Sequence, residues 1–253
     1  MSKVFINAGH GGSDPGAVGY VKEKDVNLTM AIACMDYLKA NGVEVKMSRY
    51  KDEGESLTEV INECNAYNPD YAVSIHNNAG GGDGFEVYYG IAGLGKPLAA
   101  NIEAEVKAIG QNSRGLKTKL NSKGNADYYG FIRQIKCPSI IVEGIFVDNA
   151  NDVKIADTIE EQKAFGVAYA KGILKTLGTN PKEPEINKGY LVKVTANVLN
   201  IRAGAGTNYK VTGQIKDKGT YTIVAEANGK GASKWGKLKS GVGWISLDYT
   251  KKI

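Results

Sequence analysis

The chain has 253 residues, of which 42% are hydrophobic and 23% are charged, a composition typical of a folded globular protein rather than a disordered one. Apolar runs stay well short of the roughly 20 residues that a membrane-spanning helix needs, so membrane insertion is not expected. The formal net charge of +5 is spread unevenly: residues 189–253 carry eleven lysines and arginines against three acidic residues, a net of +8, and residues 1–178 carry −3. A basic segment joined to a mildly acidic one indicates two parts with different tasks.

The N-terminus and the cysteines indicate how the chain is processed. Residues 1–3 lead straight into an apolar run, which leaves no room for a standard secretory signal, so we expect synthesis in the cytoplasm without a signal peptide. Cys34, Cys64 and Cys137 are odd in number and lack C-x-x-C spacing. Because Cys34 and Cys64 fall on the apolar faces of predicted helices, buried thiols are expected rather than disulfides or metal ligands.

Strands and helices are predicted to alternate as far as residue 177. The first strand is the apolar run at 4–6, and Asp25 is the expected cap of a helix that ends at Gly42. Two capping boxes, which start at Ser56 and Thr158, predict further helix starts. The remaining strands are expected at 43–47, 71–75, 85–89, 128–135 and 139–142, with one more helix across 98–109. This alternation predicts an α/β domain with a largely parallel or mixed sheet.

A different pattern begins after the last predicted helix. The segment 179–188 contains two prolines and no hydrophobic periodicity, which is typical of a linker. Beyond it, short alternating runs separated by Gly, Asn and Asp predict a small β-barrel. These runs are 190–194, 198–201, 220–224, 236–239 and 242–246. The expected domains are therefore 1–178, the linker 179–188, and 189–253.

The candidate chemistry is concentrated in a glycine-rich loop at residues 7–16 and at two strand ends. The loop contains His10, and the only other histidine, His76, follows the 71–75 strand. Glu143 follows the 139–142 strand in the same way. Because the carboxyl ends of parallel strands meet at one edge of a sheet, these side chains are expected to converge. Two imidazoles and a carboxylate, with water in the fourth position, form the ligand set of a catalytic Zn²⁺.

The glycine-rich loop also raises the possibility of a phosphate site. Its glycines fit neither G-x-x-x-x-G-K-[ST] nor G-x-G-x-x-G, which disfavours nucleotide binding. Either histidine alone is more easily explained as a core or turn residue, but two at strand ends, in a chain with no other histidine, favour a site.

Residue chemistry alone leaves the carboxylate ligand open. Glu23 lies two residues before the expected helix cap, but it is equally well explained as a solvated member of the charged run 22–25. Asp14, Asp25 and Glu86 are weaker candidates, because turn, cap and solvent-face roles already explain them.

Four motifs in order resemble the zinc-dependent N-acetylmuramoyl-L-alanine amidase family across about residues 3–177. They are AGHGGSDPGA at 8–17, EKDVNL at 23–28, SIHNN at 74–78, and VE at 142–143 followed by Phe146 and Asn149. The resemblance implies that His10, Glu23 and His76 bind one Zn²⁺ and that Glu143 is the catalytic carboxylate. It also implies a twisted mixed sheet flanked by helices.

The implied reaction is hydrolysis of the amide bond between N-acetylmuramic acid and the L-alanine of the peptidoglycan stem peptide. Bound zinc lowers the pKa of water from about 15.7 to about 7. Glu143 is expected to take the proton of this water and return it to the leaving amine. Asn77, Asn78 and Arg114 are candidate contacts for the stem peptide or the muramyl group, although a surface or turn role explains each of them more easily.

The C-terminal part, about residues 190–253, resembles the bacterial SH3-like wall-binding domain. The motifs are LNIRAGAGTNY at 199–209, WGKL at 235–238 and GWI at 243–245. A net charge of +8 suits anionic partners, and the absence of a base-reading motif argues against nucleic acid. We therefore expect peptidoglycan, with anionic wall polymers as further partners. Trp235 and Trp244 are expected to be core residues rather than ligand platforms.

The sequence thus predicts a two-domain peptidoglycan hydrolase, a phage or prophage endolysin that reaches the cell wall after release through a membrane pore. A host autolysin of the same activity is the alternative. A zinc peptidase acting within the stem peptide is a second alternative. A non-catalytic wall-binding protein is disfavoured, because all four proposed site residues are present. The sequence indicates no oligomeric state.

Overall fold

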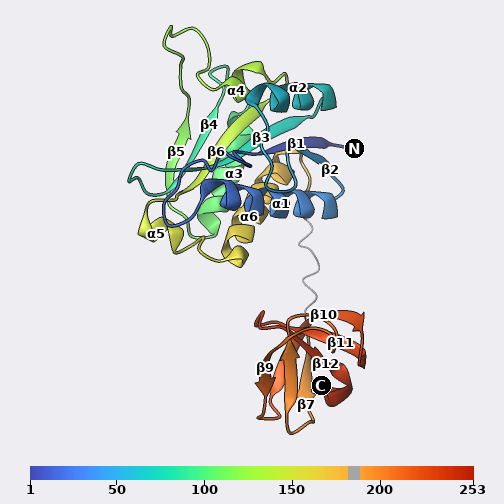
Figure 1. Ribbon diagram of the computed structural model, residues 1–253. Coiled ribbons are helices and arrows are strands. Elements are labelled where there is room, and N and C mark those ends of the chain that lie inside the picture. Colours follow the sequence, from blue (N-terminus) through green and yellow to red (C-terminus); the bar gives the residue numbers. More distant parts are fainter. Residues whose placement is uncertain (182–188) are drawn as a thin grey trace. The chain divides into compact units, whose positions relative to one another are not determined.

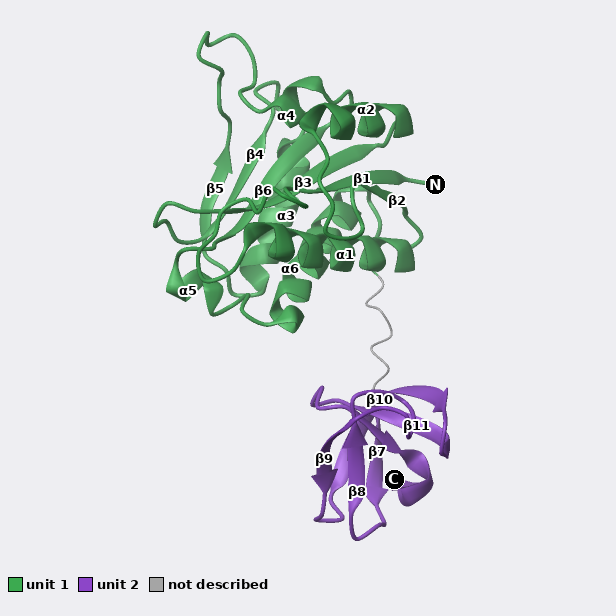
Figure 2. Ribbon diagram, viewed as in Figure 1, with its two compact units in different colours: residues 1–182 green, residues 183–253 purple. Residues whose placement is uncertain are grey.

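Residues 1–181 and 189–253 are described in the computed structural model, and they belong to two units, Met1–Lys182 and Glu183–Ile253 (Figures 1 and 2). Residues 182–188, most of the expected linker 179–188, lie outside the described residues.

The first unit is built on a mixed sheet of six strands. In chain order the strands are β1 (Lys3–Ala8), β2 (Glu44–Met47), β3 (Tyr71–Asn78), β4 (Phe85–Tyr89), β5 (Ser113–Lys117) and β6 (Ser139–Phe146). Their order across the sheet is β2-β1-β3-β6-β4-β5. The four strands β2, β1, β3 and β6 run parallel, β4 is antiparallel to β6, and β5 is parallel to β4. The carboxyl ends of β1, β3 and β6 therefore lie next to one another.

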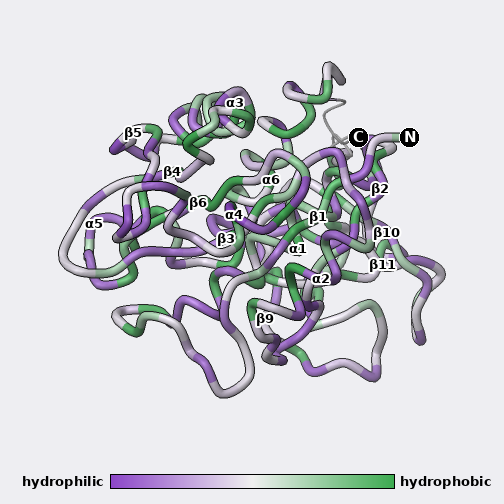
Figure 3. Tube along the Cα trace, turned by 90° about the horizontal axis from the view of Figure 1, so that it is seen from above, coloured by the Kyte–Doolittle hydropathy of each residue, from purple (hydrophilic) through white to green (hydrophobic). Residues whose placement is uncertain are grey.

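Helices cover both faces of this sheet (Figure 1). One face packs against α1 (Glu23–Ala40), α3 (Lys96–Ala108) and α6 (Ile159–Thr176) through residues such as Ile6 and Val142. The other packs against α2 (Leu57–Tyr67) and α4 (Gly130–Gln134) through residues such as Phe5 and Ile141. A short helix, α5 (Ala150–Val153), follows β6. In Figure 3 hydrophobic stretches lie along β1 and β6, and the outer loops are mainly hydrophilic. The prediction of a mixed sheet flanked by helices is confirmed.

Both predicted capping boxes are present. Ser56 accepts a hydrogen bond from the backbone N–H of Glu59 at 3.3 Å and donates its own backbone N–H to the Glu59 carboxylate at 2.8 Å. Thr158 and Glu161 form the same reciprocal pair at the start of α6. These bonds satisfy N–H groups that the first turn of a helix leaves without partners, so the start of each helix is set locally.

Three local predictions were wrong. Residues 128–135 contain the helix α4 rather than a strand, because Phe131, Ile132 and Ile135 are buried at helical rather than alternating spacing. The edge strand β5 was missed, since its sequence SRGLK shows no alternation. Asp25 does not cap α1: the helix starts at Glu23, and Asp25 lies in its first turn, where a carboxylate still favours the positive end of the helix dipole.

The second unit is an antiparallel β-structure, as predicted. Its strands are β7 (Tyr190–Val194), β8 (Leu199–Arg202), β9 (Val211–Ile215), β10 (Thr220–Gly229), β11 (Ala232–Leu238), β12 (Trp244–Ser246) and β13 (Thr250–Lys252), of which β9 and β13 were not predicted. They form one sheet in the order β13-β7-β10-β11-β12-β8-β9 around a small aliphatic core. Trp235 is buried but does not belong to this aliphatic cluster, and Trp244 is half-buried, so the expectation that both are core residues is not met for Trp244.

Two further expectations concern the membrane and the cysteines. Among the helices of the described residues, none combines the length and apolarity that a bilayer crossing requires. All three cysteines are free thiols; Cys34 and Cys64 are buried as expected, and Cys137 is partly exposed.

Candidate metal centre and active site

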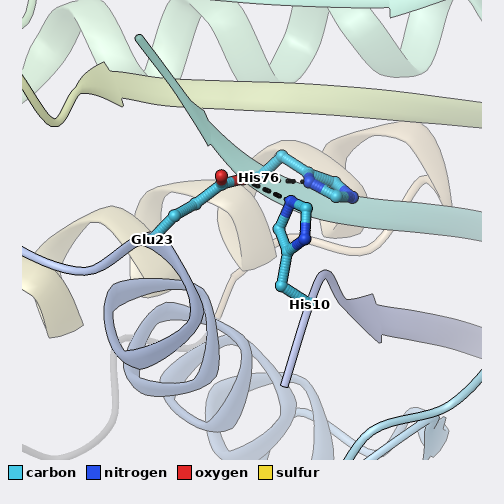
Figure 4. A group of neighbouring side chains, drawn as sticks. All are labelled: His10, Glu23 and His76. Carbon is cyan, nitrogen blue, oxygen red and sulfur yellow. Dashed lines mark hydrogen bonds and ion pairs between the residues drawn. The ribbon is translucent and has the colours of Figure 1, made fainter. Parts of the chain in front are cut away.

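His10, Glu23 and His76 come together at the carboxyl ends of β1 and β3 (Figure 4). His10 follows β1, Glu23 is the first residue of α1, and His76 lies in β3. One carboxylate oxygen, Glu23 Oε1, lies 3.2 Å from His10 Nε2 and 3.1 Å from His76 Nδ1. One ligand atom from each residue lies within 4.8 Å of the others, so the three can hold one metal ion.

Glu23 is a buried carboxylate with fixed orientation. Its Oε2 accepts the backbone N–H of Ala17 at 2.8 Å, and its Oε1 accepts that of Asn77 at 3.1 Å. Burial alone would raise the pKa of Glu23, but the hydrogen bonds to His10 and His76 outweigh it and lower the pKa well below its usual range. The charged form of Glu23 is therefore the one that this environment stabilises. Glu23 is therefore buried beside both histidines and is not a solvated member of the charged run 22–25.

His10 is oriented through its second ring nitrogen. Its Nδ1 lies 2.7 Å from Asp14 Oδ2, so the opposite nitrogen, Nε2, faces Glu23. The hydrogen bonds to Glu23 and then Asp14 raise the pKa of His10 to about 9. A carboxylate on the outer nitrogen of a histidine ligand is a common way to fix the ring and raise its basicity. Asp14, a weak ligand candidate in the sequence, has this supporting position, and Asp25 is outside the ligand cluster.

Two glycines of the loop allow the side chains to approach this closely. A Cβ on Gly9 would lie 2.2 Å from the His76 ring. A Cβ on Gly16, where φ is +64°, would lie 2.5 Å from Glu23 Oε2 and 2.7 Å from the His10 ring. Backbone thus packs directly against all three candidate ligands.

Arg49 binds the backbone of the same loop. This role was not predicted from the sequence. Only 1% of its surface is exposed, and its guanidinium donates to the carbonyl groups of Ala8 at 2.8 Å and Gly9 at 3.1 Å. It also donates to the carbonyl of Lys24 at 2.7 Å, beside Glu23. One cation therefore ties the end of β1 to the start of α1. Nothing in the sequence around Arg49 distinguishes it from an exposed arginine.

Glu143 lies on β6 directly opposite His76 on β3. The register between these strands shifts immediately afterwards, because Asn78 pairs with Phe146, which places a bulge at residues 144–145. Bulges of this kind re-aim side chains next to functional sites. Burial raises the pKa of Glu143 to about 7. A carboxyl group with that pKa can accept and release a proton near neutral pH.

The proposed substrate contacts differ in their placement. Asn77 is 2% exposed, and its side chain bonds to Asn27 at 2.7 Å and to the backbone of Ile145 at 3.0 Å, so it supports the bulge from inside the domain. Asn78 is half-buried, and its amide reaches Glu86 at 3.5 Å. Arg114 is partly exposed and forms an ion pair with Glu86.

A pocket of about 470 Å³ opens beside the metal-ligand candidates. Its walls include His10 and His76, the buried Arg49, and the segment that leads into α2. It extends to the β2 side of the ligand cluster, whereas Glu143 lies on the β6 side.

The donor set fits a small divalent metal ion. Two imidazoles, which lose their ligand-side protons when a metal binds, and one ionised carboxylate would leave a fourth tetrahedral position for water or substrate, as in catalytic zinc sites. The carboxylate lies between both rings, and Asp14 supports one of them from the second nitrogen. The cluster offers three ligands, the number that catalytic zinc sites use, whereas structural zinc sites use four.

Comparisons with known proteins agree with this arrangement. Residues 4–175 match the family model described as N-acetylmuramoyl-L-alanine amidase, and residues 197–251 match that of the bacterial SH3 domain. The chain is 32% identical over 231 residues to N-acetylmuramoyl-L-alanine amidase CwlM of Bacillus licheniformis, covering 88% of this chain and 85% of that protein.

Two further relatives extend the comparison. The chain is 31% identical over 270 residues to the endolysin of Bacillus phage SPP1, covering 96% of this chain and 95% of that one. The catalytic domain of CwlV, an N-acetylmuramoyl-L-alanine amidase from Bacillus (Paenibacillus) polymyxa var. colistinus, has a TM-score of 0.64 and 29% identity, covering 71% of this chain and 100% of that one.

Proposed function

The chain belongs to the N-acetylmuramoyl-L-alanine amidase family and is a peptidoglycan amidase, and we propose that it works with one zinc ion held by His10, Glu23 and His76. The observation that carries this proposal is the meeting of both histidines of the chain on one buried carboxylate. A buried carboxylate held in its charged form beside two imidazoles supplies the three ligands of a catalytic zinc site. When bound there, zinc supplies a water of lowered pKa and polarises the carbonyl of the scissile amide.

Glu143 is the proposed general base and acid. It is not part of the ligand cluster, it is partly exposed, and it lies opposite His76 across the β3–β6 pair. In the proposed role its carboxylate removes a proton from the attacking water and then donates it to the nitrogen of L-alanine as the C–N bond breaks. Its pKa of about 7 suits both steps.

The experiment that tests the zinc proposal is chelation followed by product analysis. Dialysis against a chelator is expected to abolish cleavage of purified peptidoglycan, and stoichiometric zinc is expected to restore it. Mass spectrometry of the digest should show intact glycan strands and stem peptides with a new free L-alanine amine. Activity that persists in the metal-free protein would refute the zinc proposal. A new amine elsewhere in the peptide would instead indicate a peptidase.

The SH3 domain and the amidase activity indicate that this chain binds peptidoglycan. We propose that anionic wall polymers add to that binding, because the segment 189–253 carries a net charge of +8. Eight surplus positive charges on a small module favour association with a polyanion at low salt. Binding to walls stripped of these polymers should then be weaker than binding to intact walls.

For the biological setting we propose a phage or prophage endolysin. Supporting this role, the similarity to the phage SPP1 endolysin spans both units of the chain. The similarity to CwlM supports the alternative, a host autolysin. Expression inside a susceptible bacterium separates the two: an endolysin should lyse the cell only when a membrane pore is opened, whereas lysis without any pore would contradict that role.

A further inference from the structure

A row of polar side chains crosses the sheet beyond the metal-ligand cluster. His76 on β3 pairs with Glu143 on β6, and Glu143 pairs with Glu86 on β4. Directly opposed residues in neighbouring strands share one face of the sheet. The three side chains therefore lie on the same face, and the row continues to Arg114 and Lys117 on β5, which both contact Glu86.

Glu86 is the buried anchor of this row. Only 4% of its side chain is exposed. Its Oε1 pairs with Arg114 Nε and, at 2.6 Å, with Lys117 Nζ, while its Oε2 accepts a hydrogen bond from the Tyr88 hydroxyl at 3.2 Å. Burial would raise the pKa of Glu86, but the hydrogen bonds to Lys117 and Arg114 lower it below the usual value. The carboxylate is thus kept ionised by two cations.

Two cations exceed what one buried carboxylate needs. One ion pair would neutralise Glu86, and the charge of the second cation is shared with Glu143, the next carboxyl group in the row, whose pKa is about 7. The side chain of Arg114 is 42% exposed and that of Lys117 is 32% exposed, so both reach solvent. Asp83 is close enough to interact electrostatically with Arg114, but within the described residues the two form no ion pair.

The guanidinium of Arg114 is held in a defined orientation with donors to spare. Its Nε is used by Glu86, and its Cζ lies 5.3 Å from the centre of the Phe146 ring, next to the β6 bulge. In the part of the chain that the structure describes, its two Nη groups have no hydrogen-bond partner. An arginine fixed by a carboxylate on one side and an aromatic ring on the other presents a flat fork that matches a second carboxylate.

The position of Arg114 and Lys117 matches the peptide half of the substrate. The strand β5 lies two strands beyond β6, a distance of about 10 Å. An extended peptide covers about 10 Å in three residues. The pocket beside His10 lies on the opposite side of the cluster and can take the N-acetylated sugar, which carries no charge for a cation to bind. The cations therefore lie where acidic groups of the stem peptide would reach.

We propose that Glu86 holds Arg114 and Lys117 as a binding site for a carboxylate of the stem peptide, within about three residues of the scissile amide. The inference rests on the proposed function, because it assumes that the scissile amide of the substrate lies between Glu143 and the metal-ligand cluster. In this arrangement Arg114 and Lys117 contact the substrate, and Glu86 is a positioning residue. The site selects peptides in which that carboxylate is free over those in which it is an amide.

The test uses two pairs of synthetic N-acetylmuramoyl tripeptides and the full chain loaded with zinc. One pair differs only in a free carboxylate or a carboxamide on the second residue, and the other differs only in a free or amidated C-terminus. For the unmodified protein, kcat/KM is expected to be about tenfold higher or more for the acid of one pair, as for a charged hydrogen bond. The pair that shows this preference identifies the carboxylate.

Variants then assign the preference to residues. Arg114→Gln is expected to reduce the acid-to-amide ratio to about one, and Arg114→Lys to retain part of it. Lys117→Gln leaves Arg114 paired with Glu86, and it should also reduce the ratio, so the test survives if Arg114→Gln unfolds. Lys123→Gln, an exposed lysine in the loop after β5, is the matched control and should keep the full ratio.

Each contrary outcome has a distinct meaning. Equal kcat/KM for acid and amide in both pairs would overturn the carboxylate site and leave the amidase function standing. If Arg114→Gln lowers kcat/KM by the same factor for the acid and the amide of a pair, the arginine only supports the fold. Failure of the unmodified protein to cleave any of the four compounds would overturn the proposed function itself, and this inference with it.

Discussion

At the scale of single residues, the cluster of His10, Glu23 and His76 depends on the space around the Glu23 carboxylate. The carboxylate bonds to two backbone N–H groups and lies against two imidazoles. Gly16 approaches it so closely that no side chain fits between them. The proposed metal site is therefore expected to be sensitive to one added methyl group.

Gly16→Ala is expected to weaken zinc binding and lower stability. The new Cβ would lie 2.5 Å from Glu23 Oε2, at a φ of +64° that already strains a non-glycine residue. Gly42→Ala is the matched control, because Gly42 has a φ of +79° but no atom within 4 Å of the added Cβ. Both variants should lose about 1 kcal/mol of unfolding free energy from strain. Only Gly16→Ala should raise the zinc Kd in a chelator competition; equal Kd values would contradict the packing argument.

Glu143→Gln is expected to keep zinc and lose activity. The substitution preserves size and removes the proton-accepting group, which is worth about 10²–10⁴-fold in rate. Zinc content by elemental analysis should stay at one per chain, since Glu143 is outside the ligand cluster. Hydrolysis of a soluble muramoyl peptide is the measurement. A variant with near-full activity would exclude Glu143 as the general base.

At the scale of elements, the bulge after Glu143 links the sheet to the site. Three buried polar side chains satisfy its backbone: Asn77 accepts from Ile145, Asp152 accepts from Phe146, and Gln111 donates to Gly144. Buried backbone groups without such partners would destabilise the domain. The irregular end of β6 is therefore stabilised by side chains from three separate segments.

The capping boxes allow an element-scale prediction about stability. Ser56→Ala and Thr158→Ala each remove the side-chain acceptor at a helix start, which costs about 1 kcal/mol. Denaturant unfolding should show midpoints lowered by similar amounts with unchanged slopes. Thr29→Ala is the control, because the Thr29 hydroxyl bonds within α1 and caps nothing. A midpoint for Thr158→Ala equal to that of Thr29→Ala would contradict the capping assignment.

At the scale of the whole molecule, catalysis and wall binding are expected to separate. A protein truncated after residue 178 should hydrolyse soluble muramoyl peptides with unchanged kcat/KM, because every site residue lies in the first unit. Its retention on insoluble walls should fall, since the second unit raises the local concentration of the enzyme at its substrate. Wall pelleting assays measure this, and undiminished pelleting would refute the targeting role.

Salt supplies the corresponding control on the full chain. If the net charge of +8 on residues 189–253 contributes to retention, pelleting of the full chain should fall as ionic strength rises through about 0.1 to 1 M. The truncated protein should show little change over the same range.

The sequence by itself determined the features that depend on near neighbours. Alternation of apolar runs predicted the α/β unit and the β-unit, and both capping boxes predicted helix starts, because the bonds that make them span three residues. The pair of histidines at strand ends predicted that the two side chains converge, since the carboxyl ends of parallel strands lie along one edge of a sheet. The resemblance supplied Glu23.

The tertiary structure decided what depends on contacts between distant segments. Glu23 and His76 are 53 positions apart, and Arg49 reaches the Gly9 carbonyl across 40 positions. No local pattern marks such pairs. A buried Arg49 and an exposed arginine have the same sequence neighbours, and Glu86 reads as a solvent-face residue until β5 brings two cations to it. Burial and charge pairing are properties of the folded domain, so the roles of Arg49 and Glu86 could be recognised only in the tertiary structure.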